Sequence, residues 1–165
     1  MTGTGTVSTG GRRHGRHGLL RMAGALVAAA AITAGAATVA VGQGDPIAER
    51  KALFKQMGAA LREPGKMLKG EATFDLAAVK AALETVATSS AKLPALFPDG
   101  SDTGDTAALA KAWEDRADFN ARFVNLSKDA RAALASVTDA ESFRTVMPKL
   151  LGQCGACHKI YRKPS

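Results

Sequence analysis

Helical periodicity runs through almost all of the chain between residues 46 and 161, and no other feature restricts the possible folds as strongly. Apolar side chains recur every three or four residues in four segments, and none of these segments shows the alternation of a half-buried strand. Prolines, glycines and polar residues separate the segments. Four amphipathic helices in succession predict an all-α fold, an antiparallel four-helix bundle.

Residues with strong positional preferences mark the ends of these helices. Pro46 suits the first turn of the first helix, and the Pro-Gly pair at residues 64–65 should bend or interrupt its end. Asp75 is a favourable N-cap for the second helix. The third helix is expected from about residue 106 to 136, and a Thr-x-x-Glu capping box that starts at Thr138 predicts the beginning of the fourth.

Residues 1–42 differ in composition from the rest of the chain. They hold four arginines and no acid, and they end in an uncharged, alanine-dominated stretch from Met22 to Gly42. A basic segment followed by an apolar run and small residues is the layout of an export signal peptide, with cleavage expected before Gln43. The apolar run also reaches the length of a membrane span, so an uncleaved anchor is the alternative. Residues 43–165 are then expected to form one periplasmic domain.

The positive charge of the chain belongs largely to this leader. The whole chain has 22 Lys and Arg against 15 Asp and Glu, a net charge of +7. Because four arginines and no acid lie in residues 1–42, residues 43–165 carry only +3. That part lacks the strong basic excess typical of nucleic-acid-binding proteins, so no nucleic-acid partner is expected.

The chemistry of the chain is concentrated in the motif Cys154-Gly-Ala-Cys157-His158, near the end of the fourth helix. On a helix, side chains at this spacing share one face. Two thiols can then reach the two vinyl groups on one edge of a porphyrin while the adjacent imidazole reaches the iron. C-x-x-C-H is the signature of covalent haem attachment. One haem c is therefore expected, with Cys154 and Cys157 as thioethers and His158 as the axial iron ligand.

Three rival interpretations of the motif are disfavoured. A zinc site needs about four ligands, and residues 43–165 contain no further cysteine or histidine. A thiol oxidoreductase usually places C-x-x-C beside a strand, whereas this motif ends a helical segment. A chance match is disfavoured because covalent haem attachment is an extracytoplasmic process and this chain has an export signal.

The residues leave the second axial position of the iron undecided. With one histidine in residues 43–165, the second ligand could be a methionine, a less common group, or nothing. The methionines of that part are Met57, Met67 and Met147. Met147 shares a helix with His158 and cannot easily cross to the opposite face of the haem. Met57 on the first helix could do so, although a core position is the simpler interpretation for it.

The sequence resembles cytochrome c′ and its low-spin relatives, the class II c-type cytochromes. The resemblance rests on C-x-x-C-H-x-x-Y-R and on the stretches KGEATFDLAAVKAAL, LPALFP and AWEDRADFNA, and it covers essentially all of residues 43–165. It implies a protein that binds NO and CO, or that exchanges electrons with periplasmic redox proteins, and that pairs into a homodimer. No acid or base suited to process a bound ligand is evident, so no enzyme activity is expected.

The resemblance also assigns roles outside the motif. The family places an arginine four residues before the side chain on the distal side of the haem, which here are Arg50 and Phe54. It implies that Arg50 pairs with a haem propionate. Phe54 cannot ligate iron, which implies a five-coordinate, predominantly high-spin haem under an aromatic lid; a six-coordinate, low-spin electron carrier with a methionine ligand is the alternative. Arg162 is expected in the proximal pocket, or otherwise in a solvated tail.

Overall fold

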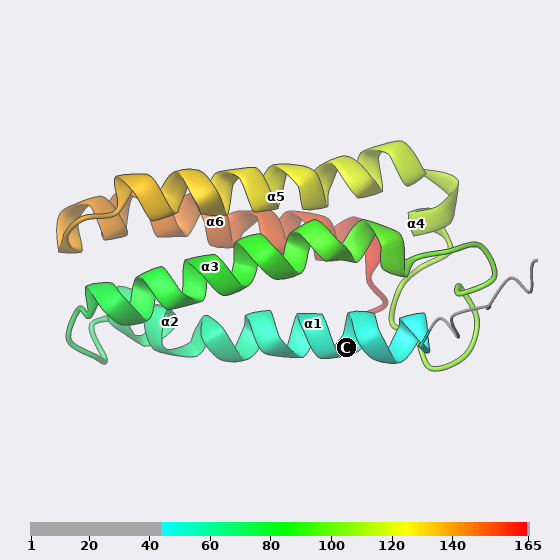
Figure 1. The fold of residues 1–165 in the computed structure, drawn as a ribbon, viewed down its shortest axis with the longest axis horizontal. Helices are drawn as coiled ribbons and strands as arrows, with labels where there is room; N and C mark the ends of the chain where they lie inside the picture. The colour runs from blue at the N-terminus through cyan, green and yellow to red at the C-terminus, as the bar shows by residue number, and fades with distance from the viewer. Residues whose placement is uncertain (1–43, 165) are drawn as a thin grey trace, which may run out of the picture. The chain divides into compact units, whose positions relative to one another are not determined.

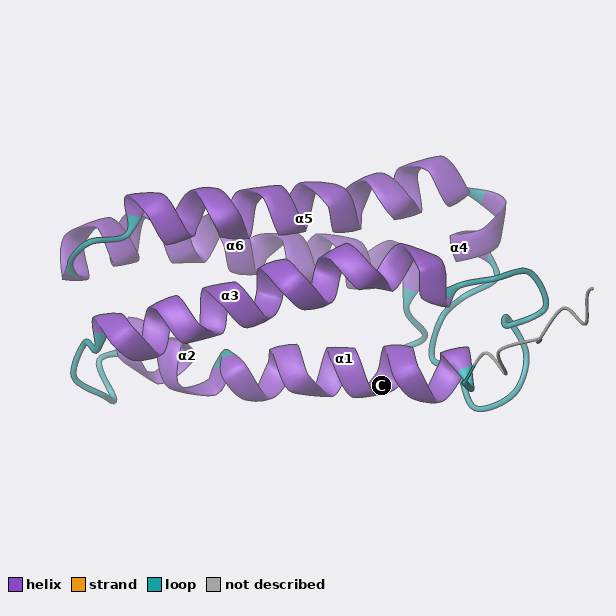
Figure 2. Ribbon diagram, in the orientation of Figure 1, coloured by secondary structure: helices purple, strands orange, loops and turns teal. Residues whose placement is uncertain are grey.

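The computed structural model describes residues 44–164, and these form a bundle of helices (Figures 1 and 2). The elements in chain order are α1 (Pro46–Ala60), α2 (Arg62–Lys69), α3 (Leu76–Lys92), the 3-10 helix η1 (Leu93–Leu96), α4 (Lys111–Glu114), α5 (Arg116–Ser136) and α6 (Ala140–Tyr161). The four long helices, α1, α3, α5 and α6, run alternately in opposite directions (Figure 1). The predicted antiparallel four-helix bundle is therefore confirmed.

The predicted export signal, residues 1–42, lies outside the described residues. Within residues 44–164, none of the helices has the length and apolar character needed to cross a bilayer.

Several helix ends lie where the sequence predicts them. Pro46 occupies the first turn of α1. Asp75 caps α3, since its side chain accepts a hydrogen bond from the backbone N–H of Ala78 at 3.1 Å. The interruption predicted at residues 64–65 lies earlier, because the chain leaves α1 and enters α2 at Leu61 and Pro64 is inside α2. Pro64 still accounts for the break, because it has no N–H to donate to the carbonyl four residues earlier.

Two predicted helix starts are wrong. The capping box of α6 is one residue later than predicted: Asp139 accepts from the N–H of Ser142 at 2.8 Å, and the Ser142 hydroxyl accepts from the N–H of Asp139 at 3.1 Å. The helix predicted from residue 106 begins only at Lys111, as α4, and is then interrupted. The backbone at Asp115 leaves the helical region (φ −103°, ψ 40°), and the long helix begins only at Arg116.

The interruption before α5 has a tertiary cause. The indole Nε1 of Trp113 donates to the carbonyl of Pro98 at 3.0 Å, and Nη1 of Arg116 donates to the carbonyl of Phe97 at 2.8 Å. Both sides of the break are thus attached to the loop that follows η1. These long-range bonds outweigh the local preference for one continuous helix.

The long helices form a row of packed neighbours rather than a closed ring. α3 packs extensively on α5, while α1 packs on α3 and α6 packs on α5. The core between them is apolar and includes Leu83, Phe119, Phe123, Phe143 and Met147. In the part of the chain that the structure describes, α1 and α6 have no comparable packed contact with each other. The two helices that carry most of the predicted site residues therefore do not pack directly against each other.

The C-terminal end of α6 is attached to the segment before α4. Ala108 and Arg162 form an isolated antiparallel bridge. The N–H of Leu109 donates to the carbonyl of Tyr161 at 2.9 Å, and the N–H of Lys163 donates to the carbonyl of Ala107 at 2.8 Å. These bonds fix the last turns of α6, which carry the C-x-x-C-H motif.

Candidate functional site

A large cavity lies among α1, α5 and the last turns of α6. Its volume is about 1070 Å³, at the upper limit of ordinary small-molecule pockets. All six residues predicted for the site line it: Arg50, Phe54, Cys154, Cys157, His158 and Arg162. The fold thus brings the first and last helices of the domain together around one space.

The C-x-x-C-H motif presents its reactive side chains to this cavity from one face of α6. Cys154 and Cys157 are partly buried free thiols, and His158 is exposed. Among residues 44–164, no three His, Cys, Asp or Glu side chains are grouped as they would be around a metal ion. The arrangement of the three side chains on one helix face matches the signature for two covalent bonds and one axial bond to a single large cofactor.

The protonation of these groups agrees with that interpretation. Burial raises the pKa of Cys154 and of Cys157, whereas a thiol that catalyses disulfide exchange needs a lowered pKa. Although His158 as a residue is exposed, partial shielding of its imidazole from water, with a smaller contribution from the charge of Arg162, lowers the pKa of His158. The neutral imidazole is the form that binds a metal, so the pocket favours His158 as a ligand.

The rest of the lining fits a porphyrin. Apolar side chains that could contact a macrocycle come from α1, α3, α5 and the loop: Phe54, Met57, Val86, Phe97, Phe119 and Phe123. Basic side chains that could attract its carboxylates also line the cavity: Arg50, Lys51, Lys55, Arg122 and Arg162. A flat apolar ring with two acidic substituents matches both sets.

Phe54 and Met57 lie about one turn apart on α1 and both line the cavity. Phe54 is 37% exposed, and its ring centroid lies 6.1 Å from that of Phe123. Met57 is buried. Met67 and Met147 belong to the core but do not line this cavity. Of the three methionines considered from the sequence, Met57 alone is placed near the site.

Arg50 is 2% exposed and holds the loop after η1. Its Nη1 donates to the carbonyl of Leu96 at 3.0 Å and to the hydroxyl of Ser101 at 2.9 Å. Its Nη2 donates to the carbonyl of Ser101 at 2.7 Å and to the hydroxyl of Thr106 at 2.8 Å. These bonds use all four Nη hydrogens and leave only Nε–H. The propionate role of Arg50 stays a prediction, but a bidentate pairing through the Nη groups would require the loop to release them.

We expect Arg50→Met to lower the free energy of unfolding by about 3 kcal/mol, because several acceptors in the loop would lose a charged donor. Arg50→Lys keeps the charge without the planar fork, so an intermediate loss is expected. Denaturant unfolding of the haem-loaded protein, followed by circular dichroism, measures both values. A loss below about 1 kcal/mol in Arg50→Met would show that the loop does not depend on these bonds.

Arg162 lies at the C-cap of α6, with an extended backbone and an exposed side chain. Its N–H donates to the carbonyl of His158 at 3.2 Å. The antiparallel bridge to Ala108 fixes its backbone, and the residue lines the cavity. Arg162 is therefore attached to the site and does not belong to a free tail; its proximal role stays a prediction.

A group of three hydrogen-bonded residues in the cavity was not predicted from the sequence. Asp118 and Arg122 on α5 form an ion pair at 2.7 Å, and the hydroxyl of Tyr161 on α6 donates to the same carboxylate oxygen. All three line the cavity. The i, i+4 spacing of Asp118 and Arg122 indicates their pairing, but nothing local in the sequence connects them with Tyr161.

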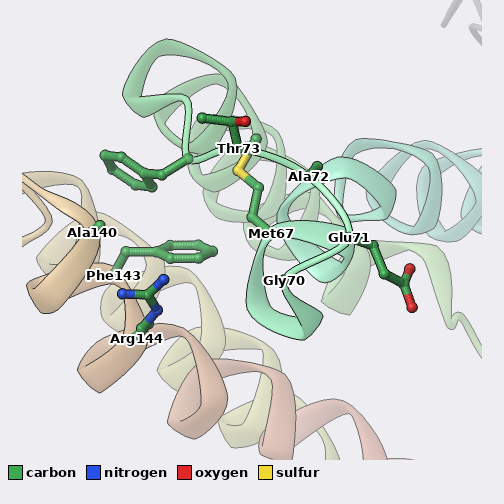
Figure 3. A pocket seen from close by; sticks show the side chains of 9 residues that line it. Met67, Gly70, Glu71, Ala72, Thr73, Ala140, Phe143 and Arg144 are labelled. Carbon is green, nitrogen blue, oxygen red and sulfur yellow. The ribbon is translucent and has the colours of Figure 1, made fainter.

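A second cavity of about 440 Å³ lies between the α2–α3 connection and the start of α6 (Figure 3). In Figure 3, Phe143 of α6 points toward Met67 of α2, and Arg144 lies beside it. None of the predicted site residues lines this cavity. The chemistry predicted from the sequence therefore belongs to the larger cavity alone.

Residues 45–162 match the family model described as Cytochrome C'. The chain is 49% identical over 124 residues to a cytochrome c′ of Rhodopseudomonas palustris, with 74% of this chain and 85% of the relative covered. It is 42% identical over 117 residues to a cytochrome c-556 of Agrobacterium fabrum, with 70% and 80% covered. The solved structure of cytochrome c′ from Rhodopseudomonas palustris matches with a TM-score of 0.72 at 48% identity, and the match covers 74% of this chain and 99% of that one.

These matches extend over the whole described bundle, and the C-x-x-C-H motif, the cavity and its lining agree with them. The chain belongs to the cytochrome c′ family, whose proteins carry a covalently attached haem c.

Proposed function

We propose that this chain is an exported haem protein that binds small neutral diatomic gases, NO and CO, at an open coordination position of a five-coordinate, high-spin iron. When bound, the haem supplies the iron that coordinates the gas. Cys154 and Cys157 hold the cofactor covalently, and His158 is its axial ligand. The observation that supports the open position is that Phe54, which has no atom able to ligate iron, lines the cavity from α1, whereas His158 lines it from α6.

Phe54 would select ligands by size. Its ring is partly exposed and packs near Phe123, so a gas entering from the α1 side has to displace it. Neither Phe54 nor Met57 can donate or accept a proton. A gas bound on the α1 side of the cavity would therefore be held without chemical conversion, and we assign no enzyme activity. Arg162, next to the His158 side of the cavity, would act on a ligand that replaced the imidazole.

The same proposal includes the cellular location of the protein, its oligomeric state and its redox partners. The leader over residues 1–42 has the layout of an export signal, and this supports a periplasmic location. We further propose a homodimer in solution, and exchange of electrons with periplasmic redox proteins as an accompanying role.

One spectroscopic experiment tests the open position. The resting ferric protein is expected to give high-spin optical and EPR spectra, because a single imidazole leaves the iron five-coordinate. Titration of the reduced protein with NO should shift the Soret band until one equivalent is bound. A low-spin ferric spectrum with no response to NO would refute the proposal.

A second candidate function is electron transfer by a six-coordinate, low-spin haem. The position of Met57 favours it, because this methionine lines the cavity from the same helix as Phe54. Relatives named cytochrome c-556 occur beside those named cytochrome c′. Low-spin ferric signals that disappear in Met57→Leu would establish this function in place of gas binding.

A further inference from the structure

Tyr161 is the single tyrosine of the chain and one of its least accessible aromatic residues. It is 3% exposed and follows the axial ligand His158 by three positions on α6, so both side chains occupy the same end of the helix. Both residues line the large cavity. A buried phenol therefore lines the same cavity as His158.

The hydroxyl of Tyr161 donates a hydrogen bond to Oδ2 of Asp118. The same oxygen accepts from Nε of Arg122 at 2.7 Å, and the guanidinium carbon of Arg122 lies 5.5 Å from the tyrosine ring centroid. The phenol, carboxylate and guanidinium therefore form one connected group that lines the cavity from α5 and α6.

The charges in this group keep each member in a defined protonation state. The hydrogen bond from Arg122, followed by the one from Tyr161, lowers the pKa of Asp118, so its carboxylate stays ionised at neutral pH. Burial and the bond to Asp118 raise the pKa of Tyr161, so the phenol keeps its proton. The result is a protonated phenol bonded to a base that can take the proton.

We propose that Tyr161 and Asp118 form a redox site, in which Tyr161 gives one electron to the haem when the iron reacts with hydrogen peroxide and passes its phenolic proton to Asp118. This inference rests on the proposed function, since peroxide needs the open iron position to react. Its consequence is protection of the cofactor, because an oxidising equivalent that would damage the porphyrin moves to a side chain.

The electrons and atoms balance with peroxide as the oxidant. Breaking the O–O bond takes two electrons, of which Tyr161 would supply one and the haem the other. One peroxide oxygen would leave as water with both peroxide protons, and the other would stay with the oxidised haem, so no further reductant is needed. Loss of the phenolic O–H proton to Asp118 leaves a neutral tyrosyl radical. Asp118 is half-exposed and can release that proton to solvent.

The single tryptophan of the chain is the rival donor, and its surroundings suit the reaction less well. The indole N–H of Trp113 donates to a neutral carbonyl, that of Pro98, which is a far weaker base than a carboxylate. The guanidinium of Arg50 also lies 5.5 Å from the Trp113 ring and opposes the positive charge that oxidation would leave there. At Tyr161 the proton leaves with the electron, so Arg122 faces no new positive charge on the ring.

The test uses the ferric, haem-loaded protein mixed with hydrogen peroxide, frozen rapidly and measured by EPR in the free-radical region. The wild type is expected to give a tyrosyl signal that narrows when the protein is made with ring-deuterated tyrosine. Tyr161→Phe should lose the signal, and its haem should bleach faster. Asp118→Asn removes the proton acceptor at constant size and should lower the radical yield severalfold. Trp113→Phe is the matched control and should keep the signal.

Each alternative outcome is decisive. A high-spin protein that reacts with peroxide but gives no deuterium-sensitive tyrosyl signal would overturn the redox role of Tyr161 alone. A radical that survives in Tyr161→Phe and is lost in Trp113→Phe would transfer that role to Trp113. A low-spin protein that does not react with peroxide would overturn the open iron position and this inference together. The isotope experiment needs no substitution, so a variant that failed to fold would not remove the test.

Discussion

Replacing both Cys154 and Cys157 by alanine is expected to leave a protein from which acid-acetone extracts all of the haem, whereas the wild type should keep it. The reason is that the two thiols are the only cysteines of the chain and the only groups able to form thioether bonds. Each single substitution should retain haem through the remaining bond. Because the cofactor would fill a cavity of about 1070 Å³, we also expect the double variant to unfold at a much lower temperature.

Gly155→Ala is the matched control for this double variant. It lies inside the motif, but a Cβ added there meets no atom within 4 Å, and the residue does not line the cavity. This variant should keep its haem after extraction. Covalently held haem in the Cys154→Ala/Cys157→Ala protein, or its loss from Gly155→Ala, would contradict the assignment of the thioethers.

Phe54→Met is expected to convert the resting ferric protein from high spin to predominantly low spin. Phe54 lines the cavity from α1, so a thioether at this position would offer the iron a second axial ligand opposite His158. The same substitution should weaken NO binding strongly, because the gas would compete with a protein ligand. Optical and EPR spectra of the ferric protein and an NO titration of the reduced protein measure both effects.

Phe54→Leu separates ligation from packing in this experiment. Leucine alters the shape of the side chain but supplies no donor atom, so the ferric haem should stay high-spin and NO should still bind. If Phe54→Met and Phe54→Leu gave the same high-spin spectrum, Phe54 would not lie above the iron, and Met57 would become the position to change next.

The sequence was sufficient to predict the elements whose signals are local. The periodicity of the four long helices and the cap at Asp75 depend on residues close together in the chain, and both are found in the structure. The interruption predicted at Pro64 and Gly65 is also found, but it lies earlier in the chain, at Leu61. The spacing of Cys154, Cys157 and His158 likewise needs only one helix. Their shared cavity followed from the resemblance to a family, which supplied the partners Arg50 and Phe54 on the first helix.

Most of the features that the sequence did not predict depend on long-range contacts. The helix expected from residue 106 is interrupted because Trp113 and Arg116 bond to the loop after η1. The engagement of Arg50 by that loop, and the bond of Tyr161 to Asp118, join segments far apart in the chain. The cap of α6 is an exception, because its contacts are local. Thr138 and Asp139 are both good capping residues, and the bonds with Ser142 show that Asp139 is the N-cap.

Thr106 forms hydrogen bonds with residues on both sides of the large cavity. Its hydroxyl accepts from Arg50, one turn before Phe54 on α1, and its carbonyl accepts from the side chain of Lys163 at 3.0 Å, just beyond the helix that carries His158. Since α1 and α6 have no comparable packed contact in the described part of the chain, these two hydrogen bonds give α1 and the residues just after α6 a common partner in Thr106.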